Sequence, residues 1–263
     1  MAAEDLDKQP DSVSSVLKVF GILNALGDER DIGISELAQR VMMSKSTVYR
    51  FLQTMKALGY VSQEEETEKY SLTLKLFELG SKALVHVDAI RYANGPMREL
   101  SRQTKEAIHL GALDDDAIIY IHKIDSQYNL RMYSRIGRRN PVHSTAIGKV
   151  LMAWCEPGLR EDTLAKITFS PGTGKAVQSK EALLPLLENV RAQGYAEDVE
   201  EQEEGVRCIA VPVFDRFGVV NLGLSLSLPT VRFSEEGKPA LIALLHAAAR
   251  NVSSQLGYHD YPF

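Results

Sequence analysis

The segment SKSTVYRFLQTMKALGYV, residues 44–61, constrains the fold of this chain more than any other. Apolar residues recur in it at a spacing of three and four, which predicts a helix with one buried face. The predicted buried residues are Val48, Phe51, Leu52, Met55 and Leu58. Ser44 is the expected N-cap and Gly59 the expected C′ residue. The opposite face carries hydrogen-bond donors and no acid, so the helix either belongs to a core or reads DNA.

The flanking segments favour DNA reading. Residues 12–26 form a predicted helix that ends at Gly27, with an apolar stripe of Val13, Val16, Leu17, Phe20 and Leu23. ISELAQRV predicts a short second helix with Ser35 as N-cap and with Leu37, Ala38 and Val41 buried. YVSQEEETEKYSLT alternates apolar and polar residues around a polar tip, which indicates a two-stranded hairpin. Three helices and a hairpin predict a winged helix-turn-helix over residues 12–73, rather than an ordinary helical subdomain.

The distribution of charge agrees with this prediction. A net charge of −5 argues against a protein that coats nucleic acid indiscriminately. Residues 37–63 nevertheless contain no Asp or Glu, while they hold Arg40, Lys45, Arg50 and Lys56. We therefore expect a small DNA-reading module within an acidic protein. The hairpin tip carries Glu64, Glu65, Glu66 and Glu68, so we expect it to stay out of the groove.

Beyond residue 73 the pattern changes. We expect residues 1–11 to be a tail, residues 74–90 a linker helix and residues 91–263 a second, α+β domain. Strands are predicted at residues 108–125 (two strands around a DDD turn), 130–137, 207–215 and 219–228. Helices are predicted at residues 96–104, 144–154, 180–193 and 238–256.

Several classes of protein are disfavoured. No apolar run approaches the ~18 to 20 residues of a membrane helix, and the acidic N-terminus is no signal peptide, so we expect a cytoplasmic protein. Cys155 and Cys208 lie far apart and the histidines show no ligand spacing, so no disulfide, metal or cofactor is expected. SPGTGKAV lacks the first glycine and the final hydroxyl of a phosphate loop, and GLSLS is not GxSxG. We predict no catalytic residue.

Polar residues of the second domain suggest a binding site. In PVHSTAIGKVLMAW, Ser144 or Thr145 caps a helix and the N–H groups of Ala146 and Ile147 remain open, which makes either an anion site or an ordinary capped helix. Asp198 follows as part of an acidic run that is either a solvated loop or the mouth of a pocket. Ser225 and Ser227 share one strand face, which is a polar surface or a pocket wall.

Two of these segments resemble the signatures of the IclR family of transcriptional regulators: PVHSTAIGK, and GYAEDVEEQEEGVRCIAVPVFDRFG followed by SLSLP. The resemblance runs from Ser12 to the C-terminus. It implies a homodimer, or a pair of dimers, that places two winged helices on a palindromic operator in double-stranded DNA, with a GAF-like effector-binding domain. In members that bind small keto acids, the ligand carboxylate lies on a helix N-terminus. The positions that match the ligand contacts here are Ala146, Ile147, Asp198, Cys208, Ser225 and Ser227. Ile147 is bulkier than the small residue of some relatives.

Within the family, SKSTVYRFLQTMKALGYV, YSRIGRRNP and GYHDYPF resemble a repressor of pectin-degradation genes that senses 2-keto-3-deoxygluconate. We therefore expect a repressor of sugar-acid catabolism that a small keto sugar acid releases from DNA. The expected DNA-binding residues are Ser44, Lys45, Ser46, Thr47, Tyr49, Arg50 and Gln53, with Arg50 foremost. An activator would use the same residues, and an enzyme acting on a sugar acid is the less favoured alternative.

Overall fold

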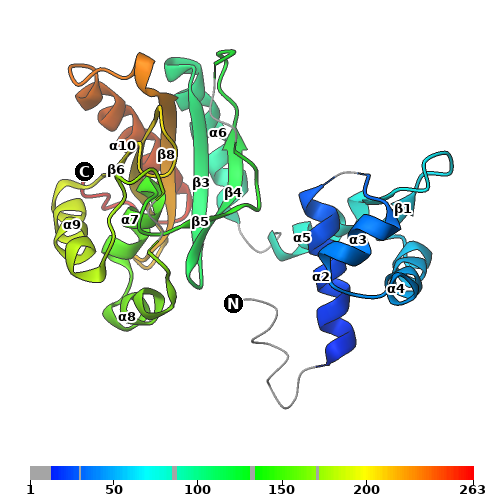
Figure 1. The fold of residues 1–263 in the computed structure, drawn as a ribbon. Coiled ribbons are helices and arrows are strands. Elements are labelled where there is room, and N and C mark those ends of the chain that lie inside the picture. Colours follow the sequence, from blue (N-terminus) through cyan, green and yellow to red (C-terminus); the bar gives the residue numbers. More distant parts are fainter. Residues whose placement is uncertain (1–12, 30, 85–87, 131–133, 170–171) are drawn as a thin grey trace. The chain divides into compact units, whose positions relative to one another are not determined.

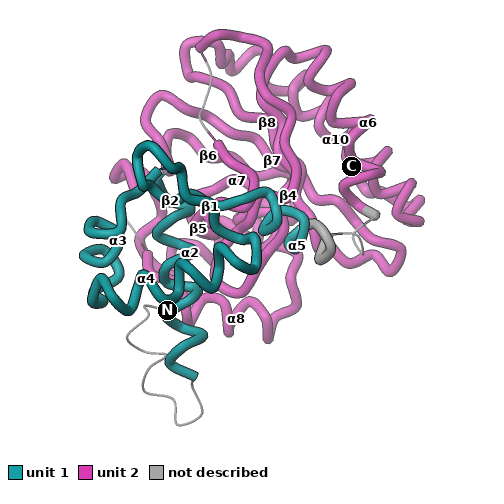
Figure 2. The backbone as a smooth tube through the Cα atoms, turned by 90° about the vertical axis from the view of Figure 1, so that its right-hand side faces the viewer, with its two compact units in different colours: residues 1–87 teal, residues 88–263 magenta. Residues whose placement is uncertain are grey.

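The chain divides into two compact units, residues 1–87 and residues 88–263 (Figure 2). The computed structural model describes residues 13–29, 31–84, 88–130, 134–169 and 172–263. The first unit is mostly helical and the second mixes strands with helices, so the predicted α+β fold class with an N-terminal winged helix-turn-helix is confirmed. The predicted tail over residues 1–11 lies outside the described residues.

The first unit contains three helices followed by a hairpin (Figure 1). The helices are α2 (Ser14–Asp28), α3 (Ile34–Arg40) and α4 (Lys45–Ala57). Strands β1 (Val61–Gln63) and β2 (Tyr70–Leu72) pair antiparallel and form the wing, and α5 (Leu74–Leu84) follows. The helices and the wing share one apolar core, in which Ile22, Leu37, Val48, Leu52 and Val61 are almost fully buried.

Both predicted ends of α4, the helix within residues 44–61, are confirmed. The N-cap Ser44 accepts a hydrogen bond at its Oγ from the N–H of Thr47 at 3.2 Å. At the other end Gly59 has a φ of +80°, and its N–H donates to the carbonyl of Lys56. The N–H of Tyr60 donates to the carbonyl of Met55, which completes a Schellman motif. The cap residues therefore fix the length of α4.

The predicted apolar stripe of α2 is only partly its buried face. Leu23 packs against the core and Leu17 is half-buried, but Val13, Val16 and Phe20 are 60%, 49% and 60% exposed. Ile22 and Leu26, outside the stripe, lie in the core. The prediction was wrong for the three exposed residues because α2 is apolar on more than one side, and only the side that meets its neighbours becomes buried. On α4, Leu58 is also exposed, at 54%, although its spacing placed it on the core face.

The boundaries of α2 and α3 also differ from the prediction. Helix α2 continues through Gly27 to Asp28. Helix α3 begins at Ile34 with Gly33 as its N-cap, so Ser35 lies inside the first turn and is not the cap. Glycine is an acceptable N-cap, and a serine two positions later does not shift the helix start.

The second unit is built on a six-stranded antiparallel sheet in the order β5-β4-β3-β8-β7-β6. The strands are β3 (Ala107–Asp114), β4 (Ala117–Ile124), β5 (Arg139–Pro141), β6 (Ala196–Val199), β7 (Val206–Phe214) and β8 (Val220–Pro229). Strands β3 and β8 pair at the centre, although more than 100 residues separate them: Gly111 lies opposite Gly223. The two halves of the sheet are therefore joined by a pairing between segments far apart in the sequence.

Helices cover both faces of this sheet (Figure 1). Helices α6 (Asp88–Thr104) and α10 (Lys238–Gln255) pack against each other and against β3, β4, β7 and β8. Helix α7 (Ala146–Trp154) packs across the sheet and against α9 (Lys180–Gln193). Helix α8 (Pro157–Lys166) and the single 3₁₀ turn η1 (Thr230–Arg232) complete the described elements of this unit.

Most predicted elements of the second unit are present, but the described part of one predicted strand is irregular. Of residues 130–137, residues 131–133 lie outside the described residues, and the remainder is irregular, with a turn at Gly137, where φ is +83°. The strand β5 begins only at Arg139, because a left-handed glycine interrupts the extended backbone. The helix predicted at residues 96–104 starts at Asp88, with Pro96 inside it, and α8 and β6 were not predicted.

Candidate functional site

The exposed face of α4 is open and basic. Ser44, Lys45, Ser46, Tyr49 and Arg50 are exposed, while Thr47 is half-buried. Among the residues that the structure describes, no ion pair involves Lys45 or Arg50. Both cations are therefore available to a polyanion, and the positive end of the helix dipole lies beside Lys45.

Gln53 and Lys56 behave differently from the rest of this face. Gln53 lies close enough to Tyr70 on β2 to lower the pKa of the tyrosine, against the rise that burial causes. Lys56 Nζ donates to Gln63 Oε1 on β1 at 3.2 Å. Both side chains thus hold the wing against α4. Of the seven predicted DNA-binding residues, Gln53 is the one directed to the hairpin.

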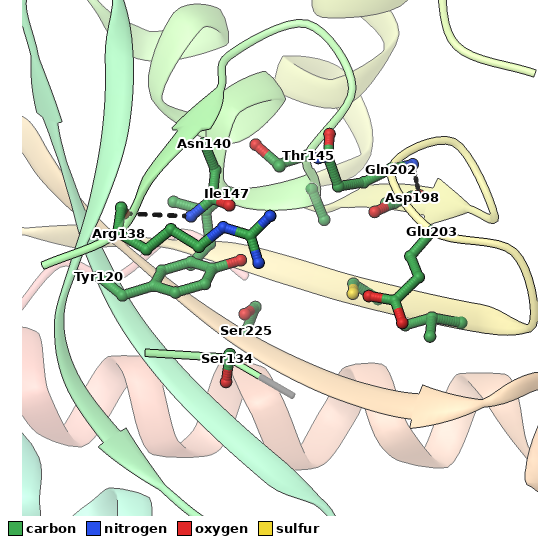
Figure 3. Close-up of a pocket in the computed structure, with 13 residues that line it drawn as sticks. Tyr120, Ser134, Arg138, Asn140, Thr145, Ile147, Asp198, Gln202, Glu203 and Ser225 are labelled. Atoms are coloured by element: carbon green, nitrogen blue, oxygen red, sulfur yellow. Dashed lines mark hydrogen bonds between the residues drawn. The ribbon is translucent and has the colours of Figure 1, made fainter. Parts of the chain in front are cut away.

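The second unit contains a cavity of about 60 Å³ among α7, β4 and β6 to β8 (Figure 3). It lies where the first turn of α7 meets the loop between β6 and β7. The lining residues are Tyr120, Ser134, Arg138, Asn140, Thr145, Ala146, Ile147, Asp198, Gln202, Glu203, Val206, Cys208 and Ser225. Five of the six predicted effector contacts are among them, drawn from segments far apart in the sequence. A single water needs ~10 to 15 Å³ of such space, so the cavity suits a small polar molecule.

The N-terminus of α7 faces this cavity with open donors. Thr145 is the N-cap: its Oγ1 accepts from the Gly148 N–H at 3.2 Å and donates to the Pro141 carbonyl at 2.7 Å. The N–H of Lys149 donates to the Thr145 carbonyl and makes the first helical hydrogen bond. The N–H groups of Ala146 and Ile147 therefore have no helical acceptor, as at every helix start. Of the two residues that the sequence offered as caps, the structure selects Thr145.

Two glycines of the sheet accommodate the bulk of Ile147. A Cβ atom on Gly223 would lie 2.9 Å from Ile147 Cγ2, and one on Gly111 would lie 3.1 Å from the same atom. The branched side chain therefore packs into a depression of the sheet where β3 and β8 pair. Ile147 nevertheless remains one of the residues that line the cavity.

Asp198 is held by the loop that follows β6. The carboxylate is only 4% exposed, and its Oδ1 accepts from the N–H of Glu201 at 2.8 Å and from that of Gln202 at 3.4 Å. Burial raises the pKa of Asp198 to about 6, although these hydrogen bonds oppose the rise. The side chain is thus an ionised acceptor at neutral pH and becomes a donor in mild acid.

A buried ion pair ties the same loop to α7. Lys149 is almost fully buried, and its Nζ donates to the Glu201 carboxylate and, at 2.9 Å, to the Glu197 carbonyl. Ser144 Oγ donates to Gln202 Oε1 at 2.8 Å. The acidic run is therefore not a freely solvated loop: two of its residues are fastened to the start of α7.

The three remaining predicted contacts lie on neighbouring strands. Ser225 and Cys208 line the cavity. Ser227 does not; its Oγ donates to Cys208 Sγ at 3.1 Å and lies 3.4 Å from His109 Nδ1. Burial raises the pKa of the Cys208 thiol above its ordinary value, which keeps it protonated. Ser227 therefore does not line the cavity itself, but its hydrogen bond holds Cys208, which does.

Sequence reasoning missed several lining residues. They are Tyr120, Ser134, Arg138, Asn140, Gln202, Glu203 and Val206. Arg138 carries a positive charge into the cavity, near the ring of Tyr120 (Figure 3). Its segment YSRIGRRNP supported the family resemblance but was not assigned to the site. No local sequence pattern assigned Ser134 to the site, because residues 130–137 were predicted to form a strand.

Two classes of site find no support in the described part of the chain. No group of three His, Cys, Asp or Glu residues there is arranged to hold a metal ion. No described helix is both long and apolar enough to cross a membrane.

A winged helix-turn-helix with an open basic helix, together with an α+β unit that encloses a polar cavity, defines a DNA-binding transcriptional regulator with an effector-binding domain. Two family models match the chain: the IclR helix-turn-helix domain over residues 15–65, and the bacterial transcriptional regulator IclR C-terminal domain over residues 81–254. The chain belongs to the IclR family.

Known proteins similar to this chain cover its whole length. It is 72% identical over 263 residues to the HTH-type transcriptional regulator KdgR of Dickeya chrysanthemi. The matched region covers 100% of this chain and 86% of that protein. It is 71% identical to KdgR of Escherichia coli K12, over 100% of both chains. The crystal structure of an IclR homolog complexed with 4-hydroxybenzoate, from Microbacterium hydrocarbonoxydans, has a TM-score of 0.79 and 25% identity, and covers 92% of this chain and 99% of that chain.

Proposed function

We propose that this protein is a repressor of genes for sugar-acid catabolism, among them pectin-degradation genes, and that a small keto sugar acid releases it from its operator. The first candidate effector is 2-keto-3-deoxygluconate. The observation that carries the proposal is the enclosed polar cavity at the start of α7, in a chain 71% identical over its full length to a KdgR protein.

The polar groups of the cavity suit the two ends of such a ligand. A carboxylate on the N–H groups of Ala146 and Ile147 would also benefit from the cation of Arg138. Asp198 accepts from hydroxyl groups of the carbon chain, and Ser225 exchanges hydrogen bonds with them. The IclR homolog bound to 4-hydroxybenzoate shows that a related fold takes a small carboxylate.

For DNA we propose that α4 enters the major groove. Ser44, Lys45, Ser46 and Thr47 lie at its start, where helix residues meet phosphates and base edges, and Tyr49 and Arg50 lie on the next turn. Gln53 contributes by fixing the wing. A homodimer with two such helices would read a palindromic operator, since the symmetry of the protein then matches that of the site.

We further propose that residues 12–73 are the DNA-binding domain, residues 74–90 the linker, whose described helix α5 covers Leu74–Leu84, and residues 91–263 the effector domain. The signal would pass through α5, where Leu74 and Phe77 expose large apolar side chains. The effector must then bind the DNA-free state better, and a coupling of ~1 to 3 kcal/mol would suffice.

Fluorescence anisotropy of a labelled duplex from a pectin-degradation promoter tests the proposal. The protein is titrated at fixed salt, with and without 2-keto-3-deoxygluconate. Tight binding that the sugar acid weakens supports both the DNA reader and the effector. Tight binding that ignores the sugar acid removes this ligand but keeps the regulator, and in vitro transcription from the same promoter separates repression from activation.

We propose that the cavity binds its ligand without turnover. Ser134 and His109 are in contact, but burial lowers the pKa of His109 to about 3, which makes it a poor general base at neutral pH. Chemical conversion of 2-keto-3-deoxygluconate by the purified protein, followed by NMR, would revive the enzyme alternative.

A further inference from the structure

A buried hydrogen-bond chain lies beneath the effector cavity. His109 on β3 is fully buried, and its ring stacks on Tyr120 with centroids 4.7 Å apart. Its Nε2 lies 2.7 Å from Ser134 Oγ and its Nδ1 lies 3.4 Å from Ser227 Oγ, which in turn lies 3.1 Å from Cys208 Sγ. Tyr120, Ser134 and Cys208 line the cavity, whereas His109 does not. The histidine thus touches the polar groups of the site from behind.

The ring is neutral, so it has one donor and one acceptor. Burial, aided by the charge of Lys123, lowers the pKa of His109 to about 3. A neutral imidazole donates through one nitrogen and accepts through the other. The tautomer therefore decides whether Ser134 is an acceptor or a donor toward the cavity. If Nε2 accepts, the Ser134 hydroxyl donates to the ring and can only accept from a ligand. If Nε2 donates, the Ser134 hydroxyl accepts from the ring and its proton is available to a ligand.

Three observations favour the tautomer protonated at Nδ1. The hydroxyl proton of Ser227 goes to Cys208 Sγ, the nearer partner, which leaves its lone pairs for an Nδ1 donor. Lys123 Nζ donates to the Ser134 carbonyl at 2.9 Å and is paired with Asp125 at 2.7 Å, but its charge acts on the ring more strongly than that of Asp125 and disfavours a proton on the Nε2 side. Burial, aided by the charge of Asp198 opposite it in the β6–β7 register, raises the pKa of the Cys208 thiol, so Sγ stays neutral and accepts from Ser227.

We propose that His109 is a positioning residue of the effector site, and that its Nδ1-protonated tautomer makes Ser134 a hydrogen-bond acceptor that selects ligands with a hydroxyl group. The inference rests on the proposed function and deepens it, because it names the class of ligand: hydroxylated acids in preference to acids of equal length without hydroxyls. A ligand that lacks the hydroxyl leaves a buried acceptor unpaired.

The tautomer itself is measurable without any ligand. Long-range ¹H–¹⁵N correlation spectra of the full chain with labelled histidine, at pH 7 and pH 5, identify the protonated nitrogen of each ring. The His109→Phe variant assigns the signal by its loss, and Ser134→Ala, which perturbs Nε2 alone, assigns it if that variant does not fold. We expect a neutral ring protonated at Nδ1 at both pH values. Protonation at Nε2, or an imidazolium at pH 5, would overturn the proposal.

Selection is tested with two six-carbon keto acids, 2-keto-3-deoxygluconate and 2-oxohexanoate, which has no hydroxyl group. Calorimetric titration should show that Ser134→Ala reduces the preference for the sugar acid about tenfold, by weakening its binding and by strengthening that of 2-oxohexanoate, which no longer leaves a buried acceptor unpaired. Ser126→Ala removes another buried serine, outside the cavity, and should change neither affinity. Equal losses for both acids in Ser134→Ala would overturn the selection role. If neither acid binds the unaltered protein, the proposed effector is wrong. The NMR measurement of the tautomer, which needs no ligand, then still tests the proposal for His109.

Discussion

Arg50 and Asp198 show how differently single residues serve the two units. Arg50 is an exposed cation on a helix face without acids, where a polyanion can reach it. Asp198 is a buried carboxylate whose position depends on two backbone donors from its own loop. The first acts through its charge, and the second through the protonation state that its surroundings impose.

Replacing Arg50 with alanine tests whether α4 reads DNA. We expect operator affinity to fall 10- to 100-fold, the ~1 to 3 kcal/mol of a lost phosphate or guanine contact. Effector affinity and the thermal midpoint should not change, because the side chain is exposed. Arg102→Ala is the matched control, since it removes an exposed arginine from the other unit. A loss of thermal stability equal to the loss of binding would indicate that α4 is only a core helix.

The protonation of Asp198 predicts the pH dependence of effector binding. Its pKa of about 6 lies above the ordinary value, so the acceptor is ionised at pH 7 and neutral at pH 5. A ligand carboxylic acid, with a pKa of roughly 3.5, stays ionised over this range. We therefore expect effector affinity to decrease as the pH falls through 6, and Asp198→Asn to remove this dependence. If calorimetry instead shows tighter binding in acid, the ligand carboxylate, and not a hydroxyl, faces Asp198.

At the scale of the element, the start of α7 is the most constrained part of the site. A Cβ atom on Gly148 would lie 2.2 Å from the Val142 carbonyl oxygen, so only glycine lets the helix begin this close to the preceding chain. The next residue, Lys149, reaches back to the loop after β6 and holds Glu201. The helix start and the Asp198 loop are thereby joined into one support for the cavity.

Breaking this ion pair should destabilise the second unit. In Lys149→Met the carboxylate of Glu201 stays buried without its cation, and we expect a loss of ~3 to 5 kcal/mol in the free energy of unfolding in urea. The double variant Lys149→Met, Glu201→Leu should recover most of it, because no buried charge remains. The neighbouring pair of Lys175 and Glu200 is more exposed, so Lys175→Met should cost at most ~1 kcal/mol. Equal losses in the two single variants would show that burial of the pair contributes nothing.

At the scale of the whole molecule, regulation requires that the two units influence each other. Each unit has its own core, so the DNA face and the effector cavity are distinct sites in one chain. Residues 74–84 form the helix that follows the wing, and the second unit begins at Asp88. A ligand that binds one conformation better shifts the population of both units together.

Such coupling must be reciprocal. If saturating 2-keto-3-deoxygluconate lowers operator affinity by a given factor, we expect 5- to 150-fold, then saturating operator must lower the affinity for the sugar acid by the same factor. Anisotropy gives the first number, and calorimetry on the DNA-bound protein gives the second. A scrambled duplex serves as the control in both. Unequal factors would mean that the two titrations do not measure the same equilibrium, and factors of one in both would mean that the two units are not coupled.

The amino-acid sequence by itself determined the features that depend on near neighbours. The apolar spacing of α4, its cap at Ser44 and its left-handed Gly59 were all predictable, because helix periodicity and capping involve residues within about four positions. The α+β class followed from the same local patterns.

Only the tertiary structure decided which of several possible faces became buried and which residues met. The apolar spacing of Val16 and Phe20 was as regular as that of the true core face of α2, but among the described residues both side chains remain exposed. Ser225 and Ser227 share one face of β8, yet only Ser225 reaches the cavity. Ser134 and His109 are in contact although Ser134 lies outside the described strands, and a contact between such distant positions leaves no trace in the spacing of nearby residues.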